Sequence, residues 1–236
     1  MKITLLTGKT FDISSEIGMN IKVISSRSRG KLVLHIDAKE RIPVLSVPKY
    51  CSRKRAIKFV NENIDWIEEN LRKLPSIKKF MPQDIISICG KQVTICHCPN
   101  ARRGVWIEEN ILNVSGNIEF LHRRVKDYIK KQAQQNFLLR SKHLAEQLNC
   151  HINNVIIKDT KSRWGSCSVL SNINYNWRIA LAPEYVIDYL MAHEVAHLRH
   201  PDHSDEFWHC VAMLNPQWKK GKIWLQEHGK NLYAYP

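Results

Sequence analysis

The sequence predicts an α+β protein, in which small antiparallel β-sheets lie apart from a helical core. Short runs of β-branched or alternating apolar residues between turns predict the strands, most of them in the first half of the chain. Longer segments with apolar residues at helical spacing predict helices, chiefly at 52–74, 119–148 and 181–198. The 236 residues suit one large or two small domains, and a proline-containing break divides them into 1–82 and 83–236.

The first unit opens with three predicted strands, at 21–24, 32–36 and 42–47, and ends with the first long helix. The segment Ser25–Lys31 is a basic turn between the first two strands. It is a candidate phosphate contact, and a solvated turn is an equal alternative. Pro43 places the third strand at a sheet edge, because proline donates no hydrogen bond to a ladder.

The second unit alternates strands with helices. Its predicted elements are, in order, hairpins at 85–96 and 105–114, a long helix at 119–148, strands at 155–158 and 173–179, a helix at 181–198, and two further helices at 206–213 and 217–228. We expect the last two strands to pair as a hairpin directly before the helix 181–198. The exposed face of the long helix is basic, which fits either a solvated surface or contact with nucleic acid.

The net charge of +14 is unevenly distributed. Residues 1–82 hold 17 Lys and Arg against 8 Asp and Glu, residues 83–150 hold 10 against 6, and residues 151–236 hold 9 against 8. Such asymmetry favours an anionic partner for the N-terminal half, with nucleic acid or a nucleotide as the first candidate. A charge that serves only solubility is the alternative.

No stretch approaches the roughly 20 apolar residues that a membrane span needs, and the N-terminus lacks a signal-peptide core. We therefore expect a cytoplasmic protein without membrane contact, whose seven cysteines are reduced. The triplet Cys96-His97-Cys98 suggests a second metal site. However, no second cysteine pair follows at a suitable spacing, and strand alternation turns His97 away from both thiols. We expect no metal there.

The centre of the sequence is His193-Glu194-Val195-Ala196-His197 within the helix 181–198. Residues four apart lie on one face of a helix, so His193 and His197 can bind one cation together. Glu194 is then placed to activate a water molecule, as in H-E-x-x-H zinc sites. The surrounding residues are apolar, which predicts a buried helix whose ionisable groups need a partner or a metal.

Catalytic zinc usually has three protein ligands, so a third is expected nearby. Pro201 favours the end of the helix, and Ser204 is a good N-cap for the next one. His203 therefore sits where the chain folds back, and we select it as the third ligand. The rival candidates are His200, Asp202 and His209.

These motifs resemble the YgjP-like metallopeptidases, relatives of the SprT-like zinc proteases. The resemblance rests on Arg27-Ser-Arg29, Trp66-Ile67, Arg163-Trp-Gly-Ser-Cys-Ser168, Ala182-Pro183, Ile187-Asp-Tyr189, His193 to Leu198, His203-Ser204, Phe207-Trp208 and Pro216. It spans about residues 20–230 as one unit, and it implies a zincin-like catalytic core. It also implies that His193, His197 and His203 are the metal ligands and that Glu194 is the catalytic glutamate.

Two further roles are hypotheses. The hairpin before the H-E-x-x-H helix is a candidate for holding the substrate backbone by strand addition. Arg163 is a tentative catalytic residue that could stabilise an oxyanion or bind a substrate carboxylate. Alternatively, Arg163 is structural and pairs with an acid such as Asp188.

The function that we expect is zinc-dependent hydrolysis of peptide bonds, with one Zn²⁺ per chain, Glu194 as general base and a peptide or protein as substrate. One alternative is a metal-dependent nucleotide pyrophosphatase or phosphohydrolase, which would suit a basic chain. Another is a nucleic-acid-associated, SprT-like protease that acts on DNA-bound proteins, although the sequence has no separate DNA-binding motif. The sequence leaves the oligomeric state open.

Overall fold

The computed structural model describes residues 11–26 and 31–235 and confirms the α+β class. The chain forms two compact units, Met1–Ser76 and Ile77–Pro236; the sequence analysis placed the division after residue 82. Residues 27–30 of the predicted basic turn lie outside the described residues. None of the helices in the described parts of the chain is long and apolar enough to cross a membrane.

The first unit contains a three-stranded sheet in the order β1-β3-β2. Its elements are α1 (Ser14–Ile17), β1 (Lys22–Ser26), β2 (Val33–Asp37), β3 (Ile42–Pro48), α2 (Arg53–Asn61) and α3 (Ile64–Arg72). The prediction that the proline-containing strand is an edge strand was wrong, because β3 is central. Pro43 is tolerated because the parallel pairing of β3 with β1 begins only at Val44, so Pro43 faces β2 alone.

The predicted helix 52–74 is two helices, with a break at Asn63. At this break the Asn63 side chain donates to the carbonyl of Phe59 at 2.8 Å, and the Asn63 amide donates to the carbonyl of Val60 at 2.9 Å. Both helices still bury the predicted apolar stripe. The core of the unit consists of Ile13, Ile21, Leu45, Val47, Ala56, Val60 and Ile67.

The second unit contains a four-stranded sheet in the order β4-β5-β7-β6. Its strands are β4 (Ile85–Ile88), β5 (Lys91–Cys98), β6 (Val105–Glu108) and β7 (Ile111–Ser115). Both predicted hairpins are present and antiparallel. They join through a parallel pairing of β5 with β7, so the sheet is mixed and not antiparallel as expected. Each of the three sheets contains one such parallel pair, formed by strands that are not consecutive in the sequence.

The other sheet of this unit has the order β8-β10-β9 and lies against the metal-site helix. Its strands are β8 (Asn154–Lys158), β9 (Gly165–Cys167) and β10 (Asn172–Asn176). The expected hairpin of β8 with β10 was wrong, because these two strands are parallel and β9 is the antiparallel partner of β10. Consequently the predicted Arg163–Ser168 motif supplies an edge strand.

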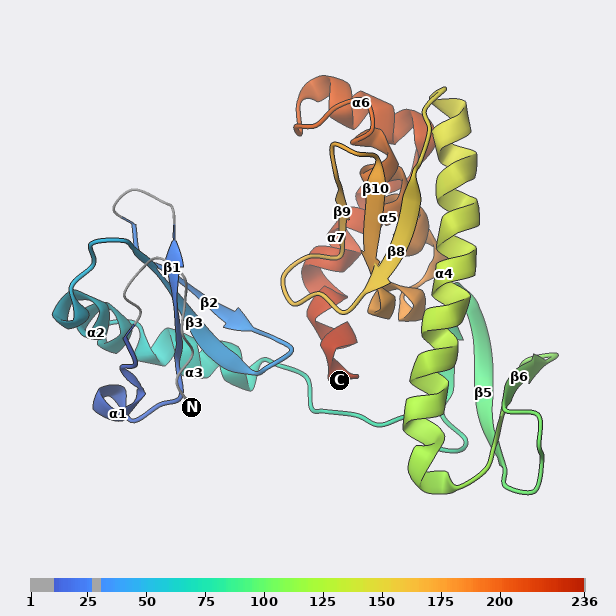
Figure 1. Cartoon of the computed structure of the whole chain (residues 1–236), viewed down its shortest axis with the longest axis horizontal. Helices are drawn as coiled ribbons and strands as arrows, with labels where there is room; N and C mark the ends of the chain where they lie inside the picture. Colours follow the sequence, from blue (N-terminus) through green and yellow to red (C-terminus); the bar gives the residue numbers. More distant parts are fainter. Residues whose placement is uncertain (1–10, 27–30, 236) are drawn as a thin grey trace. The chain divides into compact units, whose positions relative to one another are not determined.

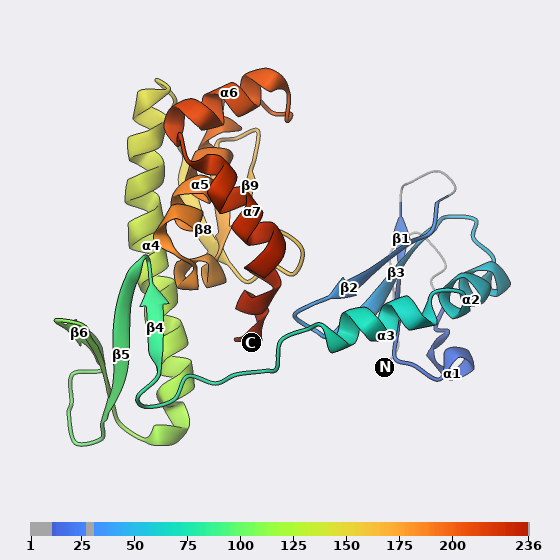
Figure 2. The same cartoon turned by 180° about the vertical axis from the view of Figure 1, so that it is seen from behind.

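The helices of this unit are η1 (Ile118–Phe120), α4 (Leu121–Gln147), η2 (Trp177–Leu181), α5 (Glu184–Ala196), α6 (Asp205–Leu214), α7 (Trp218–His228) and η3 (Gly229–Ala234). Helix α4 packs against β8 of this sheet, and α5 packs against β9 (Figures 1 and 2). Figures 1 and 2 show α4 as one long helix that runs along both sheets of the unit. Helix α5 packs against α4, α6 and α7, and most of its side chains are buried. The H-E-x-x-H segment is therefore held in the core of the unit.

Candidate metal centre

Two histidines of the candidate site lie one turn apart at the C-terminal end of α5. His193 is in the last turn of the helix, and His197 is its C-cap residue. Their ring centroids are 5.0 Å apart. Because the rest of the helix is packed in the core, both rings are presented at the same place with little freedom to move.

The third histidine comes from the link between α5 and α6. Ser204 caps α6 by accepting a hydrogen bond from the amide of Phe207, which fixes the chain just before that helix. His203 precedes this cap, and its Nε2 lies 3.2 Å from Nε2 of His193. The three histidines that the sequence analysis selected each bring one ligand nitrogen within 4.8 Å of the others.

The rival residues lie outside the histidine cluster. The carbonyl of His200 is bonded to Nδ1 of His197 at 2.9 Å. The carboxylate of Asp202 accepts from the amide of Ser204 at 3.3 Å. Neither of these residues, nor His209, belongs to the histidine cluster, which is the single group of potential metal ligands found in residues 11–26 and 31–235.

The chemistry of the three imidazoles fits a divalent transition metal. Burial, and then the neighbouring His197 and His203, lower the pKa of His193 to about 3, so this ring is neutral at pH 7. Burial also lowers the pKa of His197. When Nδ1 of His197 donates to the His200 carbonyl, the lone pair of Nε2 is left for a metal. The 3.2 Å between the two Nε2 atoms is close to the roughly 3.3 Å that tetrahedral zinc with Zn–N bonds of about 2.0–2.1 Å requires.

Glu194 lies beside the histidines and is almost fully buried, with 4% of its surface exposed. Its Oε2 atom has no hydrogen-bond partner among the described residues. Burial raises the pKa of Glu194 to about 8, and the charge of Arg163 acts against this rise. Such a carboxyl group can take up and release a proton near neutral pH.

Gly165 of β9 leaves room for the carboxyl group of Glu194. A Cβ atom added at Gly165 would lie 2.3 Å from Oε1 and 2.6 Å from Cδ of Glu194. No L-residue with a side chain fits there unless the glutamate moves. Gly165 belongs to a sequence motif, but its contact with Glu194 was not predicted, because the two residues belong to different elements and only the fold brings them together.

The site opens into a cavity of about 430 Å³ between α5 and β9. The cavity is lined by Gly165, Ser166, Cys167, Ser168, Val169, His193, Glu194, His197, Pro201 and His203. Since β9 is an edge strand, one of its sides pairs with β10 and the other has no strand partner among the described residues. Val169, in the turn after β9, lines the cavity and is a fully exposed apolar residue.

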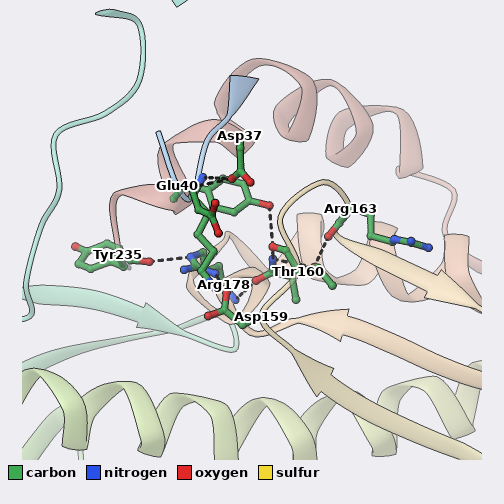
Figure 3. Close-up of polar contacts among 10 residues, drawn as sticks. Asp37, Glu40, Asp159, Thr160, Arg163, Arg178 and Tyr235 are labelled. Atoms are coloured by element: carbon green, nitrogen blue, oxygen red, sulfur yellow. Dashed lines mark hydrogen bonds and ion pairs between the residues drawn. The ribbon is translucent and has the colours of Figure 1, made fainter. Parts of the chain in front are cut away.

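Arg163 lies just before β9 and is exposed. Its carbonyl accepts a hydrogen bond from Oγ1 of Thr160 at 2.6 Å, and its side chain points away from that contact (Figure 3). It does not line the cavity, although its charge acts on Glu194. The alternative pairing with Asp188 was wrong, because Asp188 binds Arg140 of α4 at 2.5 Å. Arg140 carried no local sequence signal for this role.

Two histidines and a buried glutamate from one helix, joined by a third histidine from the link that follows it, form the arrangement of H-E-x-x-H metallopeptidases. The comparison with known families agrees with the site. Residues 30–228 match the YgjP-like metallopeptidase domain, and the chain belongs to this family. The resemblance seen in the sequence motifs is thereby confirmed. No curated protein and no solved structure matches the chain.

Proposed function

We propose that this chain hydrolyses peptide bonds and uses one Zn²⁺ ion, held by His193, His197 and His203. The observation that carries the proposal is the convergence of three ligand nitrogens within 4.8 Å of one another, beside a buried carboxyl group. Three imidazole ligands favour zinc over Mg²⁺ or Ca²⁺, which prefer oxygen ligands. A bound zinc ion supplies Lewis-acid chemistry, because it lowers the pKa of a water molecule and polarises the scissile carbonyl.

Glu194 is the general base of the proposed reaction. It accepts a proton from the attacking water and delivers it to the leaving amine. The burial that raises the pKa of Glu194 supports both halves of this task, since a carboxyl group of ordinary pKa would be a poor proton donor at pH 7. Gly165 keeps the carboxyl group at this place.

The open side of β9 is the proposed place for the substrate backbone. An extended peptide can pair with an edge strand through main-chain hydrogen bonds, and the cavity lies directly beside β9. Val169, which lines the cavity, then contacts a side chain of the peptide. This arrangement supports an unfolded protein segment or a flexible peptide as the substrate.

The substitution Glu194→Gln tests the mechanism. It keeps the size of the side chain but removes the base, so we expect turnover of a labelled, denatured protein to fall by about 10²–10⁴-fold. Metal content should not change, because Glu194 is not a proposed ligand. Glu184→Gln makes the same chemical change in the first turn of α5 and should leave turnover within about twofold of wild type. Normal turnover in Glu194→Gln would exclude the mechanism.

Hydrolysis of nucleotide phosphoanhydrides is a second candidate, which the basic composition favours. The lining of the cavity argues against it, because no Lys or Arg is among the described residues there. A triphosphate usually needs such cations. Release of pyrophosphate from nucleoside triphosphates, measured beside protein cleavage, separates the two reactions.

A further inference from the structure

Helix α2 of the first unit carries an unusual distribution of charge. Arg53 and Arg55 lie in its first turn, where the sequence has no acidic residue. Cations at this end oppose the helix dipole, which favours anions there. Arg53 is compensated by Glu16, to which its Nε donates at 3.0 Å. Arg55 lines a hollow on another face of the helix.

This hollow has a volume of about 380 Å³ and lies between α2 and the start of β2. Its lining consists of Lys31, Leu32, Val33, Arg55, Lys58, Phe59 and Glu62. The four residues from α2 are at positions i, i+3, i+4 and i+7, so they share one face of the helix. The one acid, Glu62, is 3.7 Å from Lys58. The hollow therefore has three cations, one carboxylate and an apolar floor.

The apolar floor distinguishes this hollow from a plain basic surface. Phe59 is half-buried, and Val33 is 48% exposed. Single-stranded nucleic acids bind where cations contact the phosphates and an aromatic ring stacks on a base. A duplex keeps its bases inside and would leave the floor without a partner. The unit as a whole, residues 1–76, has 15 Lys and Arg against 8 Asp and Glu, which attracts a polyanion.

We propose that this hollow binds single-stranded nucleic acid. Lys31, Arg55 and Lys58 contact phosphate oxygens, and one base lies on Phe59 beside Val33. The site is in the first unit, and the histidine cluster is in the second. Binding here is therefore independent of the proposed peptidase reaction, and it can be measured without any catalytic assay.

The test is the affinity of the full chain for a fluorescently labelled oligothymidine, measured by anisotropy at several salt concentrations. We expect affinity to fall with salt, with a slope of about −2 in log–log form for three phosphate contacts. Removing two of the cations, in Lys31→Gln with Lys58→Gln, should weaken binding at least tenfold and reduce the slope by about 1.4. The matched control is Arg72→Gln with Lys73→Gln, which removes the same charge from α3 of the same unit.

The variant Arg72→Gln with Lys73→Gln should change the affinity by less than threefold.

Phe59→Leu tests stacking, since it removes the aromatic ring but retains an apolar side chain in the core. It should weaken binding about fivefold or more without changing the salt slope. The melting temperature of each variant is compared with that of wild type. If Phe59→Leu does not fold, the affinity of the double variant Lys31→Gln with Lys58→Gln tests the proposal. His197→Ala should bind the oligonucleotide like wild type.

Four results would overturn the proposal. The first is no binding at low salt, and the second is an equal loss of affinity in the α3 control, which would mean that net charge alone acts. The third is equal binding of polyglutamate, which would point to an acidic protein partner. The fourth is tighter binding of duplex than of single-stranded DNA.

Discussion

The absence of a side chain at Gly165 leaves the space that the carboxyl group of Glu194 occupies. Gly165→Ala places a methyl group 2.3 Å from Oε1 of Glu194 and so displaces the carboxyl group. Its φ is not in the left-handed region, so the backbone itself tolerates alanine. We expect kcat to fall at least about tenfold, because small displacements of a catalytic group have effects of this size, while metal content stays unchanged.

A double variant shows whether Gly165 acts through Glu194. If it does, Gly165→Ala adds no further loss to Glu194→Gln, because the displaced group is already inactive. An additive loss in the double variant would mean that the glycine serves another purpose, such as access of the substrate to β9.

Arg163 offers a prediction on pH dependence. Burial raises the pKa of Glu194, and Arg163 lowers it by favouring the charged form. A general base is active when deprotonated, so its pKa sets the acid limb of the kcat/KM profile. Arg163→Ala removes the lowering effect, and the acid limb should move to higher pH. A reduced rate with an unmoved limb would instead assign Arg163 to substrate binding.

For single residues, the sequence predicted only those contacts that join residues close together in the chain. His193, Glu194 and His197 were found from helical spacing, and His203 from the cap that follows it. The contact of Gly165 with Glu194 and the pairing of Arg140 with Asp188 were not predicted. Both join residues from different elements, and spacing carries no information about such contacts.

An ion pair between a buried arginine and a partly buried aspartate links two segments of the second unit. Arg178 in η2 is fully buried, donates to Asp159 at 2.5 Å, and also donates to the carbonyl of Tyr235 at 2.8 Å (Figure 3). Its guanidinium lies over the rings of Trp177 and Tyr233. These contacts tie the segment before α5 to the C-terminal end of the chain.

Asp159→Asn should therefore destabilise the fold. The substitution keeps the shape of the side chain but leaves the buried guanidinium of Arg178 without this counter-charge. Removing one partner of a buried pair lowers the free energy of unfolding by about 3 kcal/mol. The control is Glu69→Gln, because Glu69 forms an exposed ion pair with Lys73 at 2.6 Å. Urea unfolding of both variants measures the difference in the free energy of unfolding. A loss no larger than that of Glu69→Gln would mean that the pair contributes little.

Secondary structure was predicted better than strand pairing. The helices α4, α5, α6 and α7 follow from apolar periodicity, and the hairpins of β4–β7 follow from turn residues. The parallel pairs of all three sheets were missed. Turn chemistry predicts pairing between consecutive strands only, whereas parallel pairs join strands that are distant in the sequence. The split of the predicted helix 52–74 was missed because the apolar spacing continues across the break.

On the scale of the whole molecule, the excess positive charge and the candidate metal site lie in different parts of the chain. The histidine cluster is in the unit Ile77–Pro236, and the hollow with three cations is in the unit Met1–Ser76. The charge asymmetry read from the sequence indicated this separation, but it could not locate the hollow. Family membership covers residues 30–228, which includes most of both units.

The central claim is that the three histidines form a metal site, and metal analysis of the purified, untagged chain tests it most directly. We expect about one zinc per wild-type chain, since catalytic sites of this type hold one ion through three protein ligands. His197→Ala should contain almost none, and His209→Ala, which removes a histidine outside the cluster, should match wild type. Absence of metal from the wild type after zinc is added back, or equal metal in His197→Ala, would contradict the account.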